Sequence, residues 1–200
     1  YEVAVIIRAG LQRMYVDNED VFYYLTIYNE NYDQPAMPDG VEQGILDGLY
    51  RWSGGWGGLQ TQASVLFSGS AQGAAREAQR ELAERWGIGV ELWSATNYKS
   101  LREDALQVER WNRMHPTTEP REALVSQLLG DGPGPVIAVS DFMRAVPEQI
   151  ARFVRRPFSV LGTDGMGRSD TREQLRAFFE TDAANVVVTV LAKLAEDGRV

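Results

Sequence analysis

Strand-like and helix-like segments alternate along most of this chain of 200 residues, and this alternation constrains the fold more than any other feature. Apolar, β-prone runs at 63–67, 89–93, 135–139 and 158–161 are separated by amphipathic segments long enough to be helices. Parallel strands need a crossover connection, usually a helix, so this order predicts a mainly parallel sheet. We expect an α/β fold, a three-layer α/β/α sandwich with helices on both faces of the sheet.

The expected helices are recognised by apolar residues at helical spacing. They cover 71–86 and 98–114, part of 142–154, and about 170–179. Asp170 and Glu173 resemble a capping box, which predicts that the helix at 170–179 begins there. A last helix carries apolar residues at i, i+3, i+4 and i+7, which are Val187, Val190, Leu191 and Leu194.

The amino-terminal part is less regular. An opening helix is expected, and its apolar face is marked by Val3, Ile7, Gly10, Leu11 and Met14. The run at 21–28 is continuously β-prone, which predicts a strand covered on both faces. A short helix is expected from about 41 to 51, followed at 53–58 by a glycine-rich connector that is our candidate domain boundary. Because no capping residue precedes the opening helix, we expect the chain to be part of a longer polypeptide.

Composition excludes several classes of function. The net charge of −8 disfavours non-specific binding to nucleic acid or to anionic membranes, because their phosphates would be repelled. The chain has no cysteine, which excludes disulfides, thiolate catalysis and cysteine metal sites, and its only histidine, His115, excludes a two-histidine metal site. No apolar run approaches the ~20 residues of a membrane-spanning helix.

Ligands of doubly wound folds gather beyond the carboxyl ends of the strands. The glycine-rich stretch at 162–167 follows one such end and fits neither a Walker loop nor a dinucleotide-binding fingerprint. Its backbone amides could hold an anion, with Arg168 or Arg172 adding charge, or it forms a tight turn whose aspartates cap amides. The other strand ends would bring residues 68–70, 95–97 and 140–141 to the same edge.

Other polar segments are less specific. The segment Asn29-Glu30-Asn31-Tyr32 either positions a polar ligand or a neighbouring chain, or forms a solvated loop. His115 has no orienting partner in the sequence, so we interpret it as a structural or surface residue. No Gly-x-Ser-x-Gly elbow supports a serine hydrolase.

Several of these segments, taken in order, resemble the homodimeric bacterial pyruvate dehydrogenases of the transketolase-like superfamily. The segments are Asn29-Glu30-Asn31-Tyr32 with Pro35-Ala36-Met37-Pro38, Glu109-Arg110-Trp111-Asn112 with His115-Pro116, Ser140-Asp141, Leu161 to Arg172, and Asp182-Ala183 with Val186 to Val188. The resemblance covers essentially the whole chain. Met166 is a mild departure, since an aromatic residue is expected there.

The resemblance implies the carboxy-terminal part of the component that decarboxylates pyruvate. Residues 1–20 would end the pyrimidine-binding domain, 21–58 would connect, and 59–200 would form a transketolase-type C-terminal domain with a mainly parallel sheet. It also implies thiamine diphosphate and magnesium in the full-length enzyme, a homodimer, a dihydrolipoyl acetyltransferase partner and a cytoplasmic location. No nucleic-acid or membrane partner is expected.

We expect no catalytic residue, no bound cofactor and no metal ligand within this chain, because the family's diphosphate motif and catalytic histidines have no match here. The residues expected to lie at an interface or to approach the active site are Asn29, Glu30, Asn31, Tyr32, Asp164, Arg168 and Ser169. The alternative is a stand-alone doubly wound module that binds a phosphorylated small molecule.

Overall fold

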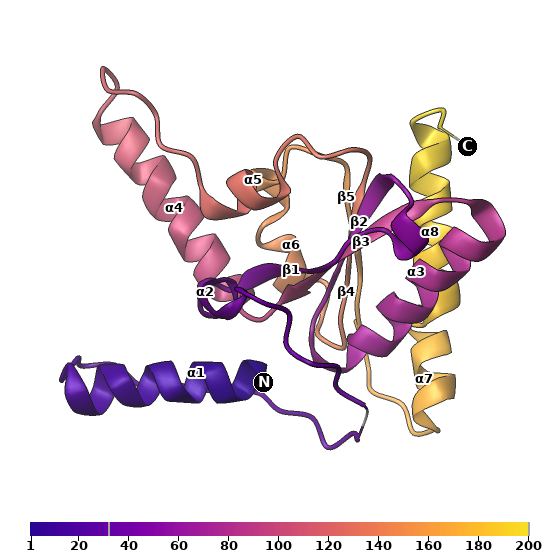
Figure 1. The fold of residues 1–200 in the computed structure, drawn as a ribbon, viewed down its shortest axis with the longest axis horizontal. Helices are drawn as coiled ribbons and strands as arrows, with labels where there is room; N and C mark the ends of the chain where they lie inside the picture. The colour runs from indigo at the N-terminus through magenta and orange to yellow at the C-terminus, as the bar shows by residue number, and fades with distance from the viewer. Residues whose placement is uncertain (32, 200) are drawn as a thin grey trace.

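A five-stranded sheet forms the centre of the computed structural model, which describes residues 1–31 and 33–199 (Figure 1). Its strands lie in the order β1-β3-β2-β4-β5. Strand β1 pairs antiparallel with β3, and the other neighbours are parallel, so the predicted mainly parallel sheet is confirmed. The strands are β1 (Leu49–Ser53), β2 (Thr61–Phe67), β3 (Gly89–Ala95), β4 (Val136–Val139) and β5 (Phe158–Leu161).

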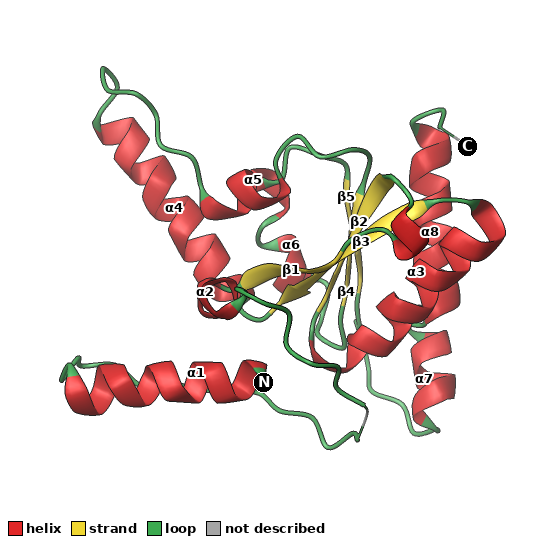
Figure 2. Cartoon of the chain, in the orientation of Figure 1, coloured by secondary structure: helices red, strands yellow, loops and turns green. Residues whose placement is uncertain are grey.

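Helices cover both faces of this sheet, as the three-layer prediction requires (Figure 2). Helices α3 and α8 pack on one face, and α4 and α5 pack on the other. The helices are α1 (Glu2–Leu11), α2 (Glu42–Asp47), α3 (Gln72–Trp86), α4 (Tyr98–Met114), α5 (Leu124–Leu129), α6 (Ala145–Glu148), α7 (Arg172–Phe178) and α8 (Ala183–Glu196). A π-turn, Gln12–Val16, follows α1, and 3₁₀ turns cover Trp56–Gly58, Gly69–Ala71 and Ala151–Phe153.

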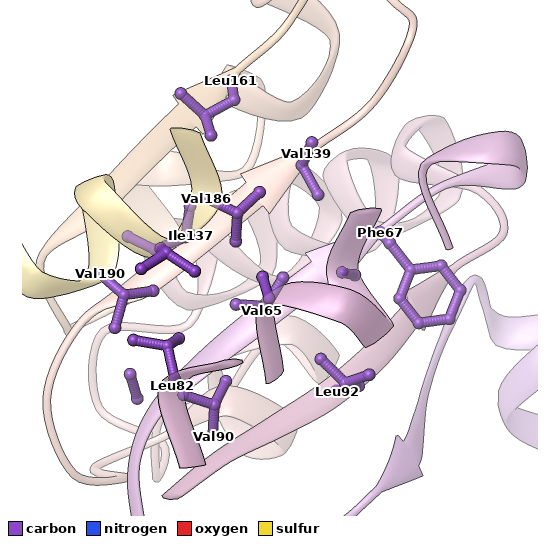
Figure 3. Close-up of a cluster of buried hydrophobic side chains, with 14 of the residues drawn as sticks. Val65, Phe67, Leu82, Val90, Leu92, Ile137, Val139, Leu161, Val186 and Val190 are labelled. Carbon is purple, nitrogen blue, oxygen red and sulfur yellow. The ribbon is translucent and has the colours of Figure 1, made fainter. Parts of the chain in front are cut away.

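The central strand β2 supplies apolar side chains to two separate cores. Val65 and Phe67 enter the core beneath α3 and α8, which Figure 3 shows with Leu82, Val186 and Val190. Leu66 enters the core beneath α4 and α5. Successive side chains of a strand point to opposite faces, so a continuous apolar run stabilises both layers at once. Each fully buried side chain of this size contributes roughly 1.5–3 kcal/mol.

A buried arginine ties the loop before β4 to β2. The Arg156 guanidinium donates to the carbonyl oxygens of Gly134 at 2.8 Å and Pro133 at 2.7 Å, and to Ser64 Oγ at 2.9 Å. Burial lowers the pKa of Arg156, because the charged form loses hydration. The hydrogen bonds to the carbonyls offset part of that cost. Through them Arg156 holds the loop before β4 in place at the amino-terminal end of the parallel strands.

The opening helix is confirmed, but three residues of its predicted apolar face are largely exposed. Val3, Ile7 and Leu11 are 46%, 47% and 50% exposed, whereas Val5 and Gly10 are buried. The described part of the chain also contains no helix long and apolar enough to cross a bilayer.

The predicted strand at 21–28 is wrong. This segment is described without strand pairing, and Phe22, Tyr24 and Ile27 are 88%, 87% and 73% exposed. A strand needs a neighbour to pair its backbone N–H and C=O groups, and β-propensity alone does not supply one.

The single helix predicted from 41 to 51 is also wrong, since the segment divides into α2 and β1. Helix α2 ends at Gly48, whose φ of +106° stops the helix, and β1 begins at the next residue. A Cβ at Gly48 would lie 2.6 Å from the Asn97 carbonyl oxygen, so this position requires glycine. The glycine-rich segment at 53–58 therefore lies between two strands of one sheet.

Two local expectations near α7 and α4 also changed. Helix α7 is capped by Thr171 Oγ1, which accepts from the Gln174 amide at 3.3 Å, so the predicted capping box is wrong. Helix α5 was not predicted, and its first amide, that of Leu124, donates to Asp104 of α4 at 2.7 Å. The other predicted elements are confirmed, including partial helix within 142–154.

Replacing the buried arginine should destabilise the fold sharply. Arg156→Met should lower the free energy of unfolding by about 2–4 kcal/mol, because several buried acceptors lose their donor. Urea unfolding followed by circular dichroism measures this change. The matched control is Arg155→Met, which removes exposed ion pairs to Glu122 and Asp131 and should cost less than about 1 kcal/mol. Equal effects of the two substitutions would contradict the role given to Arg156.

Candidate functional site

The carboxyl ends of β2, β4 and β5 meet at one edge of the sheet. Parallel pairing sets Phe67 beside Val139 and Val139 beside Leu161, so the residues that follow these strands lie close together. The Ser70 hydroxyl donates to the Asp141 carboxylate across this edge. The predicted meeting of 68–70 with 140–141 is therefore confirmed. Ser68 Oγ also donates to the Ala95 carbonyl oxygen at 2.9 Å, so the end of β3 meets the same edge. Within 95–97, Asn97 Oδ1 caps α4 through the Ser100 amide at 3.1 Å.

Helix α7 adds two arginines to this edge. The Arg176 Nη2 atom lies 3.7 Å from Asp141 Oδ2. The guanidinium also donates to both carboxylate oxygens of Glu30, at 3.1 Å and 2.5 Å. Arg172 Nη2 donates to Asn29 Oδ1 at 2.9 Å. Residues 29 and 30 therefore lie against α7 at the strand ends.

Both members of the Glu30–Arg176 pair are mostly buried, with side chains 23% and 26% exposed. Hydrogen bonding from Arg176 lowers the pKa of Glu30, although partial burial opposes that shift. The same hydrogen bonds raise the pKa of Arg176. A two-point contact of this kind fixes geometry as well as charge.

The glycine-rich loop at 161–172 uses its aspartates to bind backbone amides. Asp164 Oδ1 accepts from the Arg144 amide at 3.0 Å, and Asp170 Oδ1 accepts from the Thr171 amide at 2.7 Å. The Arg168 guanidinium lies over the Phe178 ring, 4.1 Å from its centre. This geometry matches the tight-turn alternative, because the aspartates of the loop bind backbone amides and Arg168 lies against an aromatic ring.

The expected site residues thus fall into separate groups. Asn29 and Glu30 contact α7, whereas Asp164 and Arg168 hold the loop. Asn31 and Ser169 are exposed, and Tyr32 lies outside the described residues. Sequence reasoning missed Arg176. A signal was present, since Arg172 and Arg176 are four residues apart and share one helix face.

A second group of side chains lies at the end of α4. The Trp111 ring stacks on His115 with centres 4.4 Å apart, and Arg121 lies 3.9 Å from the Trp111 ring centre. Cavities of about 430 and 410 Å³ flank this end of the helix. His115 Nδ1 lies 2.8 Å from the Trp111 carbonyl oxygen, which supports a structural interpretation. Among residues 1–31 and 33–199, no three His, Asp or Glu side chains cluster as metal ligands would.

The Glu30–Arg176 contact should make stability depend on pH. Because the folded pKa of Glu30 is lowered, its contribution is complete above the unfolded pKa of about 4.3 and is lost as the pH falls through the folded pKa. Glu30→Gln should therefore lower the free energy of unfolding by about 1–3 kcal/mol at neutral pH, and the difference from wild type should vanish in acid. Arg172 attracts the same carboxylate, and Asp141 lies 3.7 Å from Arg176 Nη2, the nitrogen that also donates to Glu30.

Urea midpoints measured across the acid range test this dependence. The matched control is Glu173→Gln, which removes an exposed carboxylate from α7, the helix that carries Arg176. A Glu30→Gln difference that does not change with pH would show that the charge of Glu30 is not what stabilises the contact.

Two family models match the chain in succession. Residues 48–182 match the transketolase-like TK C-terminal domain, and residues 1–35 match the pyruvate dehydrogenase E1 component middle domain. The pyruvate dehydrogenase E1 component of Pseudomonas aeruginosa is 45% identical over 199 residues, covering 99% of this chain and 23% of that protein. The E1 component of Escherichia coli K12 is 44% identical over 202 residues, covering 100% of this chain and 22% of its own length.

The chain therefore spans less than a quarter of the length of the curated relatives it matches. Among solved structures, transketolase from Leishmania mexicana superposes with a TM-score of 0.53 at 19% identity, over 78% of this chain and 19% of that one. Transketolase from Campylobacter jejuni gives 0.50 at 20% identity, over 80% and 20%. At these identities the likeness establishes the fold alone. The chain belongs to the family of transketolase-like C-terminal domains, and its relatives over its whole length are pyruvate dehydrogenase E1 components.

Proposed function

We propose that this chain is the carboxy-terminal portion of a bacterial pyruvate dehydrogenase E1 component. That oxidoreductase decarboxylates pyruvate and acetylates the lipoyl group of the acetyltransferase. The observation that carries the proposal is identity of 44–45% to E1 components over essentially every residue of the chain. Within the larger enzyme, this portion supplies architecture and dimer contacts.

Thiamine diphosphate and magnesium would be held outside this portion. Thiamine diphosphate, when bound, supplies the electron sink for decarboxylation, and the protein orients the reactants. In the part of the chain that is described, no cluster of three acidic or histidine side chains offers a metal site. The strand ends, where a phosphate would sit in a doubly wound fold, are filled by Asn29, Glu30 and their arginine partners.

The amino-terminal segment supports a division into parts. We propose that residues 1–20 are the end of the pyrimidine-binding domain and that 59–200 form the C-terminal domain. Residues 21–58 would be the segment that connects the two domains. The apolar face of α1 is exposed here, and patches of that kind usually mark an interface. In the longer protein this face would pack on the domain that precedes it.

The loop around Asp164, Arg168 and Ser169 would lie near a subunit interface. Met166 in this loop is 88% exposed, and Met143 and Phe178 beside it are 56% and 53% exposed. A homodimer would bury these apolar side chains. The acetyltransferase partner, the cytoplasmic location and an approach of Asn29 to Tyr32 toward the active-site mouth are proposed from the family relationship.

Activity assays test the assignment directly. The longer protein that contains this chain should decarboxylate pyruvate with thiamine diphosphate and magnesium, and the 200-residue chain should not. Calorimetry of the chain with nucleotides and phosphosugars should show no binding. Micromolar binding of such a ligand, with no pyruvate decarboxylation by the longer protein, would favour the phosphate-binding module instead.

The exposed face of α1 gives a second test. Ile7→Lys should leave the melting temperature of the 200-residue chain nearly unchanged, because Ile7 is 47% exposed. In the longer protein the same change should lower stability and turnover, since it would bury a charge. Glu77→Lys, at an exposed position of α3, is the matched control. Unchanged stability and turnover of the longer Ile7→Lys protein would rule out this face as an interface.

A further inference from the structure

The segment that fills the strand ends has the geometry of a bound ligand. Residues 28–30 come from the amino-terminal part of the chain, yet Asn29 and Glu30 contact arginines 143 and 146 positions away in the sequence. They occupy the edge where doubly wound folds bind their ligands. The surface around them therefore has the properties of a receptor for this segment.

The first property is shape. Gly69 has a φ of +53°, and a Cβ at this position would lie 2.2 Å from Tyr28 Cε2. Only glycine leaves room for the ring, so the turn after β2 forms a socket for Tyr28. The Phe142 ring lies on another side, with ring centres 6.5 Å apart. The socket thus joins the ends of β2 and β4.

The second property is a positive charge, that of Arg176, which contacts within the C-terminal domain hold in place. Ser70 donates to Asp141, and Asp141 lies 3.7 Å from Arg176 Nη2. These three residues belong to the C-terminal domain, so Arg176 is oriented by contacts that do not involve Glu30. A guanidinium held in this way presents a fork that matches a carboxylate. Glu30 fills that fork with both oxygens.

The third property is that little else attaches the neighbouring chain. Phe22, Tyr24 and Ile27, just before the socket, are each more than 70% exposed. A second contact between the amino-terminal segment and the sheet lies at Glu2. The Tyr50 and Ser94 hydroxyls donate to its carboxylate at 2.8 Å and 2.6 Å. Between these two points Val5 is buried with Ile45 and Tyr50, whereas the chain from 21 to 28 runs without strand pairing (Figure 1).

We propose that Ser70, Asp141 and Arg176 form an internal carboxylate-binding site, and that Glu30 is its resident ligand. Occupancy by Glu30 holds the amino-terminal segment on the C-terminal domain. When the Glu30 carboxylate is removed, the site accepts a free small carboxylate in its place. This proposal rests on contacts within the chain and does not depend on the activity proposed above.

Backbone ¹⁵N relaxation in nuclear magnetic resonance measures the tethering half of the proposal. In the 200-residue chain, Glu30→Ala should lower the order parameters of residues 28–31 from the range of a rigid backbone, about 0.85, to below about 0.6, because the two-point contact to Arg176 is lost. Order parameters in β2 and β4 should be unchanged. The matched control is Glu19→Ala, which removes an exposed contact to Arg13 in the amino-terminal segment. Unchanged order parameters at 28–31 in Glu30→Ala would overturn the tether.

Titration with acetate measures the receptor half. The Glu30→Ala chain should bind acetate with a dissociation constant on the order of millimolar, seen as shifts of the Arg176 side-chain signals in nuclear magnetic resonance spectra. The wild-type chain should not bind, because Glu30 occupies the fork. Acetate should not restore the order parameters of residues 28–31, since a free ion fills the site without restoring the covalent connection. Sodium chloride at equal ionic strength controls for screening.

Further variants keep the result interpretable. The double variant Glu30→Ala with Arg176→Met should lose acetate binding. If the alanine variant does not fold, Glu30→Gln replaces it in the titration. Inorganic phosphate is the second probe, and tighter binding of phosphate than acetate in Glu30→Ala would replace the carboxylate site with a phosphate site. Equal acetate binding by wild type and Glu30→Ala, or binding that survives Arg176→Met, would overturn the proposal.

Discussion

The parallel pairing of β2 with both β3 and β4 is the interaction on which the rest of the structure depends. Parallel neighbours cannot be joined by a tight turn, so each pair requires a crossover that places a helix on a face of the sheet. The helices then bury the continuous apolar side chains of β2 on both sides. Together with the parallel pairing of β4 and β5, this pairing of β2 sends the carboxyl ends of four strands to one edge, where Ser70, Asp141 and the glycine-rich loop lie.

Two arginines stabilise opposite ends of this sheet, and they bind different groups there. Arg156 is buried at the amino-terminal end and satisfies backbone carbonyls, so its contribution is to hold a loop in place. Arg176 lies at the carboxyl end and binds a carboxylate, so its contribution depends on the charge of Glu30. The family relationship and the filled strand ends both favour an architectural role, because Asn29 and Glu30 engage the arginines of α7 at this edge.

Sequence patterns predicted the elements that the chain completes for itself. Strands at 63–67 and 158–161 and the helix at 98–114 were found because their apolar faces are buried by neighbouring segments of the same chain. The run at 21–28 has the composition of a buried strand, yet its backbone forms no β-ladder with the described residues. The start of α7 was predicted one residue too early. Asp170 and Thr171 are both good capping residues, and in the folded backbone it is Thr171 that caps the helix.

Periodicity alone determined the parallel α/β class, and the order of short motifs alone determined the relationship to pyruvate dehydrogenase E1 components. Both are properties of residues that are near one another in the chain, so a sequence displays them directly. The tertiary structure decided that Glu30 meets Arg176, that Tyr28 fits over Gly69, and that the apolar face of α1 points outward. Glu30 and Arg176 are 146 positions apart, and their meeting depends on how every crossover between them packs. No local propensity encodes such a contact, because its energy exists only after the sheet has formed.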